Sequence, residues 1–437
     1  MRAALRRTIG LPAAAAMVVG TIVGASIFVQ PSEVSRAVPS FGGILLVWVV
    51  AGALTWFGAS VCAELASAYP ETGGVYVFLR EMFSPAAGFL WGWAMFWSMH
   101  SGIIAAIAVV FARYVGGIVT LGDAGVRAVA VAGILVLSAL NYAGVRPGSM
   151  VQTGLTVVKV LAIVVLLAVL FGSPTSRVPA FGAGGPIAVG GFFDALVAGL
   201  FAFGGWHMVT YAAEETRDPQ RTIPRALMIG TAVVVALYLA LNAAYLTVLP
   251  LDHVLASTRV AADATQAAAG RGAETAISLL VVVSAFGAMS GIVLAGPRVY
   301  YAMARDGLLF GWMSAVHPRF RTPFAAVAAQ AVWASVLAST GTYRALFTRV
   351  VYTEWIFFGA LALGLLRLRR TPGYAPAFRA AGGAAAPLVF AAISAAVVVN
   401  QIAADPRESL IGLALVAAGL PVYYLWKPKG AVPDARR

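Results

Sequence analysis

Long stretches of apolar residues recur along the whole 437-residue chain, and they constrain its fold more than any other feature. The hydrocarbon core of a bilayer is about 30 Å thick, so a helix that crosses it needs roughly 20 predominantly apolar residues. The stretches have this length, and polar or Gly/Pro-rich connectors separate them. We count twelve, centred near Val18, Leu54, Trp97, Leu135, Val164, Phe203, Val235, Ala288, Ala331, Phe358, Ser394 and Ala417. The sequence therefore predicts an all-α polytopic membrane protein with 12 transmembrane helices.

Composition excludes a water-soluble fold, because 61% of the residues are hydrophobic and only 11% are charged. The longest connectors, 172–190 and 250–272, are too short for a separate soluble domain, so residues 1–437 are expected to form a single membrane domain. The first apolar stretch follows Arg2, Arg6 and Arg7 and in this resembles a signal peptide. No small-residue cleavage site precedes a soluble segment, so we expect a retained helix.

The distribution of basic residues predicts the orientation of the chain. With a cytoplasmic N-terminus and alternating connectors, nineteen Lys and Arg residues fall on the inner side and eight on the outer side. Arg113, Lys159 and Arg298 fall inside predicted helices. The positive-inside rule then places both termini in the cytoplasm. The net charge of +13 is explained by these short inner connectors and by anionic lipid, and it does not indicate a nucleic-acid partner.

No enzyme or metal-site pattern competes with a membrane role. The four histidines, His100, His207, His253 and His317, are scattered, and no paired metal-ligand spacing, nucleophile elbow or phosphate-binding loop is present. Cys62 is the only cysteine and lies in the second apolar stretch, so no intramolecular disulfide is possible. We expect no catalysis, no cofactor and no bound metal.

Two apolar stretches are interrupted by glycine. The first contains Gly20 to Ser26, and the sixth contains Phe203 to Trp206, five stretches later. Paired interruptions at corresponding positions of two halves are typical of transporters built from inverted repeats, with a binding site near the membrane midplane. This favours five plus five helices, with two more at the C-terminal end. The alternative is that these glycines only allow close helix packing, as Gly20 and Gly24 would in a Gly-xxx-Gly motif.

Several motifs carry a resemblance to a known family. Val19 to Phe28 resembles the first-helix signature of permeases of the amino acid/polyamine/organocation superfamily, although Ser26 stands where the family usually has glycine. The likeness continues in the following segments: Ala63 to Leu65, Pro70 to Tyr76, Leu200 to Trp206, Glu214 to Arg225 and Ala304 to Gly307. The spacing is most similar to the L-type amino acid transporter branch.

The resemblance implies a LeuT-like fold and a secondary transporter. The first repeat would span about residues 9–172, the second about 191–370, and two extra helices about 386–427. The first and sixth transmembrane helices would be broken. Short tails and Ala/Arg-rich composition are typical of a bacterial inner-membrane protein. Residues 115–127, where animal relatives carry a cysteine for a partner glycoprotein, contain none, so we expect no disulfide-linked subunit.

The broken helices predict how an amino acid is held. Backbone N–H groups of Ala25, Ser26 and Ile27, next to Gly24, would bind the substrate carboxylate at a half-helix N-terminus. Freed carbonyl groups would accept the ammonium group, at Ile22, Phe201, Ala202 and Gly204. The resemblance makes Phe201 an aromatic gate, and makes Phe203 and Trp206 pocket walls or a second gate. Each of these aromatic residues has the alternative of facing lipid or the core.

Polar residues inside the helices are further candidates. Lys159 matches a lysine that, in sodium-independent relatives, bridges the first and fifth helices, and it either couples transport to protons or acts as a permanent strut. His207 either touches the substrate or packs as a satisfied core histidine. Glu354 would line the pathway, pair with Arg349 or face an outer vestibule, and we favour the last two combined.

The resemblance also implies an intracellular gating network of charged residues, namely Glu64, Glu214, Glu215, Arg305 and Asp306. Ordinary interfacial charges are the alternative explanation.

The sequence predicts alternating-access transport of an amino acid, driven by proton symport or by exchange. Neutral amino acids are favoured because neither interrupted segment contains an acidic residue that would hold a cationic side chain. The alternatives are an antiporter of cationic amino acids or polyamines, with Glu354 as their partner, and a nutrient sensor or channel on the same scaffold.

Overall fold

The structure, a computed structural model, describes residues 7, 9–142, 148–177, 187–320, 322–341 and 343–426. Some of the basic residues counted above lie outside these ranges: Arg2, Arg6, Arg146, Arg321, Lys427, Lys429, Arg436 and Arg437.

Helices account for the regular structure of the described residues, apart from one isolated β-bridge between Ile9 and Thr216. The first half contains α1 (Leu11–Ile22), η1 (Ser26–Phe28), α2 (Gln30–Ala37), α3 (Phe41–Ala68), α4 (Val75–Met82), α5 (Pro85–Ala94), η2 (Met95–Met99), α6 (His100–Val115), α7 (Asp123–Tyr142) and α8 (Gly148–Phe171). The second half contains α9 (Val189–Ala202), η3 (Trp206–Glu215), α10 (Pro219–Val248), α11 (Leu251–Ala256), α12 (Val260–Ala269), α13 (Arg271–Arg305), η4 (Gly311–Ser314), α14 (Phe324–Thr340) and α15 (Tyr343–Leu368). The chain ends with α16 (Ala385–Ala404), α17 (Pro406–Ala417) and α18 (Gly419–Trp426).

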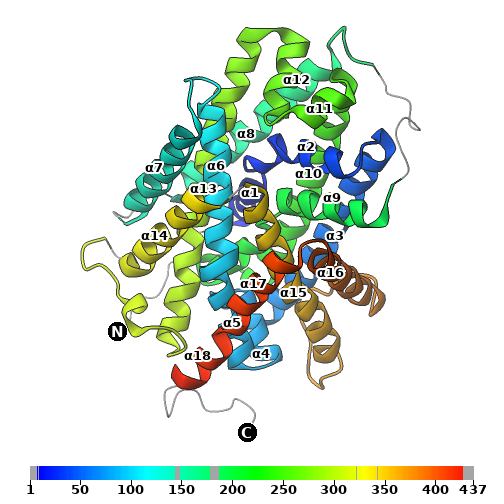
Figure 1. Cartoon of the computed structure of the whole chain (residues 1–437). Coiled ribbons are helices and arrows are strands. Elements are labelled where there is room, and N and C mark those ends of the chain that lie inside the picture. The colour runs from blue at the N-terminus through cyan, green and yellow to red at the C-terminus, as the bar shows by residue number, and fades with distance from the viewer. Residues whose placement is uncertain are drawn as a thin grey trace.

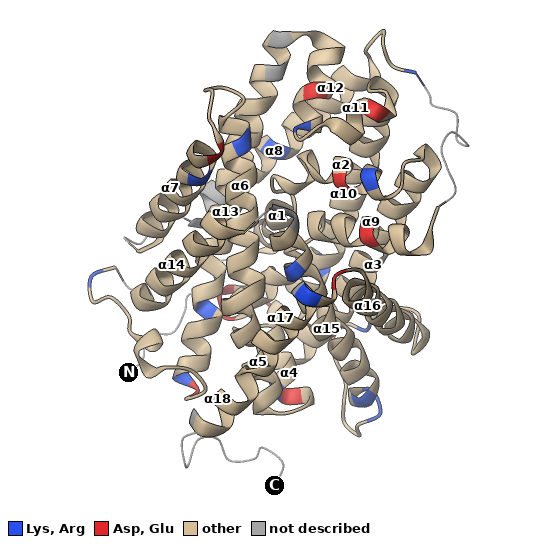
Figure 2. Cartoon of the chain, in the orientation of Figure 1, with Lys and Arg blue, Asp and Glu red and all other residues tan. Residues whose placement is uncertain are grey.

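Nine helical segments of the described chain are long and apolar enough to cross a membrane. Three shorter apolar helical segments, Leu11–Ile22, Phe324–Thr340 and Ser409–Leu425, accompany them. Each of the predicted apolar stretches coincides with one of these segments, which confirms the prediction of an all-α membrane fold. Figure 2 shows that charged residues are sparse along the long helices and lie mainly near their ends and in the connectors.

The long helices pack in two groups (Figure 1). In one group, α10 packs along α3 and α1, and η3 packs against α1. In the other, α6 packs against α13, and α14 packs against α7 and α6. Helix α8 contacts α1 and α10, while α15 contacts α16, α6 and α9. The two groups meet around the segments where α1 and α9 end.

Helix α1 stops at Ile22 because the backbone turns out of helical geometry at Val23, whose ψ is 80°. The Gly24 N–H then donates to the Ile22 carbonyl at 2.7 Å, and the chain continues through η1 into α2. Gly20 has a packing role as well, because a Cβ there would lie 2.3 Å from Thr156 Oγ1 on α8. A Cβ at Gly24 would meet Ala288 at 3.5 Å, an ordinary contact.

Helix α9 ends at Ala202, and the turn that follows requires glycine. Gly205 has a φ of 100°, in the left-handed region that is unfavourable for residues with a Cβ. A Cβ at Gly205 would also lie 3.1 Å from the Thr21 carbonyl oxygen of α1. The glycines of the two interrupted segments therefore bring the two breaks into direct contact.

Charged side chains connect the helices at the end of the molecule where α4 lies, which we call the α4 end (Figure 1). Glu64, fully buried at the end of α3, receives two hydrogen bonds from Arg369 and one from the Ala380 N–H at 2.7 Å. Asp306 accepts from Arg80 at 2.9 Å and from Tyr76 at 2.6 Å. These contacts tie the end of α3 to the segment that follows α15, and the end of α13 to α4.

The other charged residues expected in this network have different contacts. Glu215 pairs with Arg298 at 3.2 Å, and Glu214 Oε1 accepts from the Thr72 N–H at 3.5 Å. The prediction named Arg305 beside Asp306, but the described partner of Asp306 is Arg80 of α4. Arg305 and Asp306 are adjacent in the sequence, and only the folded chain brings α4 to Asp306.

Replacing Arg369 by Leu should destabilise the protein strongly, because it leaves the Glu64 carboxylate buried without its cation, at a cost of about 3–5 kcal/mol. The hydrogen bond to Glu64 raises the pKa of Arg369. As the arginine titrates, the stabilisation is fully present below the ordinary arginine pKa and is lost only above the raised one. In detergent, the thermal unfolding midpoint of the variant should lie below that of the parent protein, and the difference should be the same at neutral and at mildly alkaline pH. Arg370→Leu, a change at an exposed neighbour, is the control, and equal midpoints for the two variants would contradict this account.

Candidate functional site

A cavity lies where the two interrupted helices meet, with an empty volume of about 390 Å³. Its walls come from α1, η1, α6, α9, η3, α13 and α15. The lining residues are Thr21, Ile22, Gly24, Ser26, Ile103, Ile107, Phe201, Ala202, Gly204, Gly205, Met208, Ile292, Val350 and Glu354. The central cavity is therefore mostly apolar, with backbone of both breaks exposed to it.

The Tyr238 hydroxyl of α10 holds the two helix ends together. It lies 2.9 Å from the Ile22 carbonyl oxygen at the end of α1 and 3.2 Å from the Ala202 carbonyl oxygen at the end of α9. Tyr238 is fully buried and packs against Phe203 and Trp48. A second link is the Thr21 hydroxyl, 3.2 Å from the Gly205 carbonyl oxygen. Both links connect the C-terminal part of α1 to the break of α9.

Backbone donors without a described acceptor lie at and beside the cavity, beyond the end of α1. Among the described residues, nothing accepts a hydrogen bond from the N–H groups of Ala25, Ser26 or Ile27. Ser26 lines the cavity, and all three residues are buried. Three buried N–H groups in succession at the start of a helical turn form a site suited to a carboxylate.

Backbone acceptors lie across the cavity. The Phe201 carbonyl already accepts from the Gly204 N–H at 3.0 Å, and the Ile22 and Ala202 carbonyls receive the Tyr238 hydroxyl. Each carbonyl oxygen has two lone pairs. The Ile22 carbonyl also accepts from the Gly24 N–H, so both of its lone pairs are occupied, whereas the Phe201 and Ala202 carbonyls retain capacity for a further donor such as an ammonium group. The cavity thus offers donors for an anion and acceptors for a cation without a charged side chain at either place.

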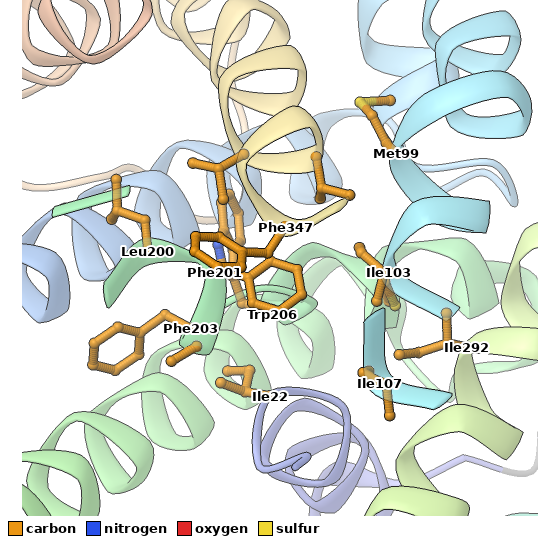
Figure 3. Close-up of a cluster of buried hydrophobic side chains, with 14 of the residues drawn as sticks. Ile22, Met99, Ile103, Ile107, Leu200, Phe201, Phe203, Trp206, Ile292 and Phe347 are labelled. Carbon is orange, nitrogen blue, oxygen red and sulfur yellow. The ribbon is translucent and has the colours of Figure 1, made fainter. Parts of the chain in front are cut away.

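An aromatic pair separates this cavity from a second, outer one. Phe201 lines the central cavity, and its ring packs on that of Phe347, with centroids 5.5 Å apart (Figure 3). Phe347 lines the outer cavity, whose empty volume is about 980 Å³. Glu33, Asp194, Arg349 and Asp405 also line the outer cavity. Moving these two rings apart would join the two spaces.

Comparison with known proteins decides the family. A family model described as "Amino acid permease" matches residues 9–418. The chain belongs to the amino acid permease family, within the amino acid/polyamine/organocation superfamily.

Curated relatives match this permease over nearly its full length. The serine/threonine exchanger SteT of Bacillus subtilis is 30% identical, covering 98% of each chain. The human b(0,+)-type amino acid transporter 1 is 30% identical over 97% of the permease and 88% of its own length. The human cystine/glutamate transporter is 28% identical over 97% and 85%. The chain is therefore a multi-pass membrane amino acid transporter and not an enzyme.

Two predicted aromatic site residues, Phe203 and Trp206, lie behind the wall of the permease cavity. Phe203 packs on Tyr238 and Trp48, on the opposite side of the break from Ile103 and Ile292 (Figure 3). Trp206 packs against Phe358. These contacts make both aromatic residues supports of the break.

His207 also lies in an aromatic cluster. Its ring packs edge-on against Trp91, Trp206 and Tyr211, and it does not line the central cavity. The ring is therefore packed in the core, although its buried Nδ1 has no described hydrogen-bond partner, so it is not the satisfied histidine of that alternative.

The two charged candidates have different positions. The Lys159 Nζ lies 3.4 Å from the Val23 carbonyl oxygen, so it connects α8 to the break of α1 and stands outside the cavity lining. Glu354, only 6% exposed, lines the central cavity. Our preferred placement of Glu354, beside Arg349 at an outer vestibule, therefore differs from the structure. Arg349 lies on the same helix, five residues earlier, and lines the outer cavity.

Sequence reasoning missed several parts of the site. Nothing distinguishes Tyr238 or Thr21 from other polar residues in apolar stretches until α10 and α1 are packed together. The apolar walls, Ile103, Ile107, Ile292 and Val350, have ordinary side chains for a membrane helix. A tyrosine in the middle of an apolar stretch was the only available signal, because a buried hydroxyl needs a partner.

Replacing Tyr238 by Phe should weaken transport and lower the thermal unfolding midpoint, because the buried Ile22 and Ala202 carbonyl groups lose the single O–H donor that they share. Each unsatisfied buried acceptor costs about 1–3 kcal/mol. Tyr245→Phe is a matched control, since Tyr245 is also fully buried on α10 and its hydroxyl has no described partner. Equal behaviour of the two variants in uptake and thermal stability would show that Tyr238 does not hold the breaks.

Proposed function

We propose that this permease exchanges amino acids across the membrane by alternating access, with the central cavity as the substrate site. The observation that carries this proposal is that both helix breaks open backbone groups into one mostly apolar cavity. One relative is by its name a serine/threonine exchanger. Exchange follows when the empty carrier reorients much more slowly than the loaded one.

The common part of an amino acid would bind to backbone. Its carboxylate would accept from the N–H groups of Ala25, Ser26 and Ile27, with Gly24 leaving room at the turn. Its ammonium group would donate to carbonyl oxygens of Phe201, Ala202 and Gly204. Burial in a water-poor space strengthens these interactions. The side chain would then extend toward α6, α13 and α15.

The helix arrangement supports an inverted repeat of five plus five helices. The first repeat, about residues 9–172, would run from α1 to α8, and the second, about 191–370, from α9 to α15. The two repeats would correspond element by element: the break after α1 to the break after α9, α3 to α10, and α6 to α13. The two members of each pair pack together. Two extra spans in 386–427 would bring the total to twelve. Both termini would lie in the cytoplasm of a bacterial cell, in agreement with the positive-inside rule.

Two barriers would alternate. Separation of Phe201 and Phe347 would open the cavity to the outer space, and release of the ion pairs at the α4 end would open it to the cytoplasm. Lys159 would act as a fixed cation that holds the Val23 carbonyl, because its amine contacts the break and lies away from the cavity lining. No disulfide-linked subunit would be needed, since the single cysteine, Cys62, is buried.

Purified permease in liposomes loaded with unlabelled amino acids should accumulate the labelled form of a substrate from outside, and unloaded liposomes should not. This trans-stimulation distinguishes exchange from channel flux and from binding by a sensor. Ser26→Phe, which fills the cavity, should abolish the accumulation while the protein remains monodisperse. Uptake that is equal in loaded and unloaded liposomes would exclude exchange, and no saturable uptake of any amino acid would exclude the proposed function.

A further inference from the structure

Glu354 is the only charged side chain among the residues that line the central cavity, all of which the structure describes. It lies on α15, with only 6% of its surface exposed. No lysine or arginine of the described chain forms an ion pair or hydrogen bond with it. Of the other side chains that line the cavity, Ile103, Ile107, Ile292 and Val350 provide no donor, and the hydroxyls of Thr21 and Ser26 provide no positive charge.

A carboxylate in such surroundings is strongly unfavourable unless a positive charge accompanies it. A bound amino acid does not provide this charge through its common part, because its ammonium and carboxylate groups neutralise each other. The backbone groups of the two breaks are the partners for those two groups. A loaded cavity therefore needs one further positive charge near Glu354.

We propose, on the basis of the proposed function, that Glu354 recognises the substrate side chain and that every loaded cavity holds one positive charge against this carboxylate. An amino acid with an ammonium or guanidinium side chain brings that charge itself. A neutral amino acid enters together with a proton, which forms an O–H bond with the Glu354 carboxylate and is taken from the water on the side of entry. The proton returns to water on the other side when the neutral substrate leaves. Exchange of a cationic for a neutral amino acid then moves one proton with the neutral one.

Other titratable groups lie on the elements packed around this part of α15, and each has its own surroundings. His100 Nε2 lies 2.8 Å from the Ile292 carbonyl oxygen, and the Tyr211 hydroxyl lies 3.8 Å from Met95 Sδ. His207 is enclosed by aromatic rings, and Lys159 contacts the α1 break. Further titratable groups on these elements are Cys62 on α3, Tyr76, Arg80 and Glu81 on α4, Asp194 on α9, Tyr300 on α13, Arg349 and Tyr352 on α15 itself, and Arg407 on α17. None of these side chains lines the central cavity.

The test compares Glu354→Gln with the parent protein in liposomes, using labelled lysine and labelled alanine, with a pH-sensitive dye trapped inside. The parent should take up both amino acids, and its alanine uptake should fall as the pH rises because Glu354 must be protonated. Lysine-loaded liposomes given alanine should acidify inside. Glu354→Gln should reduce lysine uptake by about tenfold or more, because the cationic side chain loses its buried partner. The variant should retain alanine exchange, now independent of pH and without acidification.

Asp123→Asn, the same change of carboxylate to amide at the exposed start of α7, is the matched control and should behave as the parent does. Three results would each overturn the proposal. Glu354→Gln could retain lysine uptake, the parent could exclude lysine, or alanine exchange in the variant could keep its pH dependence. Alanine exchange in the variant would still support the proposed function. Absence of exchange by the parent for every amino acid would instead contradict the proposed function.

Discussion

The structure depends on how backbone groups are satisfied where two helices break inside the membrane. A lipid environment offers no water to unpaired N–H and C=O groups, so such breaks persist only where protein or a polar cavity provides partners. Here the Tyr238 hydroxyl lies within hydrogen-bonding distance of the last carbonyl groups of both α1 and α9, and Thr21 connects to Gly205. Among the described residues, nothing accepts from the N–H groups of Ala25, Ser26 and Ile27 after the α1 break. The proposed function assigns these donors to the carboxylate of the substrate.

The remainder of the molecule positions and isolates this site. One helix group contains both breaks, and the other provides apolar walls through α6 and α13. Phe201 and Phe347 separate the central cavity from the outer one, and buried ion pairs connect the helices at the α4 end. In the proposed transport cycle, the pair of rings would be the outer barrier and the ion pairs at the α4 end would be the inner one. Alternating access would require each barrier to open while the other stays closed.

The sequence predicted the parts of the fold that have a local cause. Apolar length marked the membrane helices, and the glycines at 24 and 205 marked the two interruptions. The sequence did not reveal the contact between Tyr238 and Ile22, which are 216 positions apart, because it exists only after α1 and α10 pack together. Glu354 was expected nearer Arg349, yet it lines the central cavity. Phe203 and Trp206 are aromatic at suitable positions, but packing directs them behind the cavity wall.

The central claim is that an amino acid occupies the space beside Ser26, between the two breaks. The single buried cysteine, Cys62, can be replaced by alanine to give a cysteine-free background in which Ser26→Cys is labelled by a small thiol reagent. The account predicts that a transported amino acid slows this labelling in proportion to its occupancy, while labelling of Thr348→Cys in the outer cavity is not slowed. Labelling of Ser26→Cys at the same rate with and without a transported amino acid would contradict the claim.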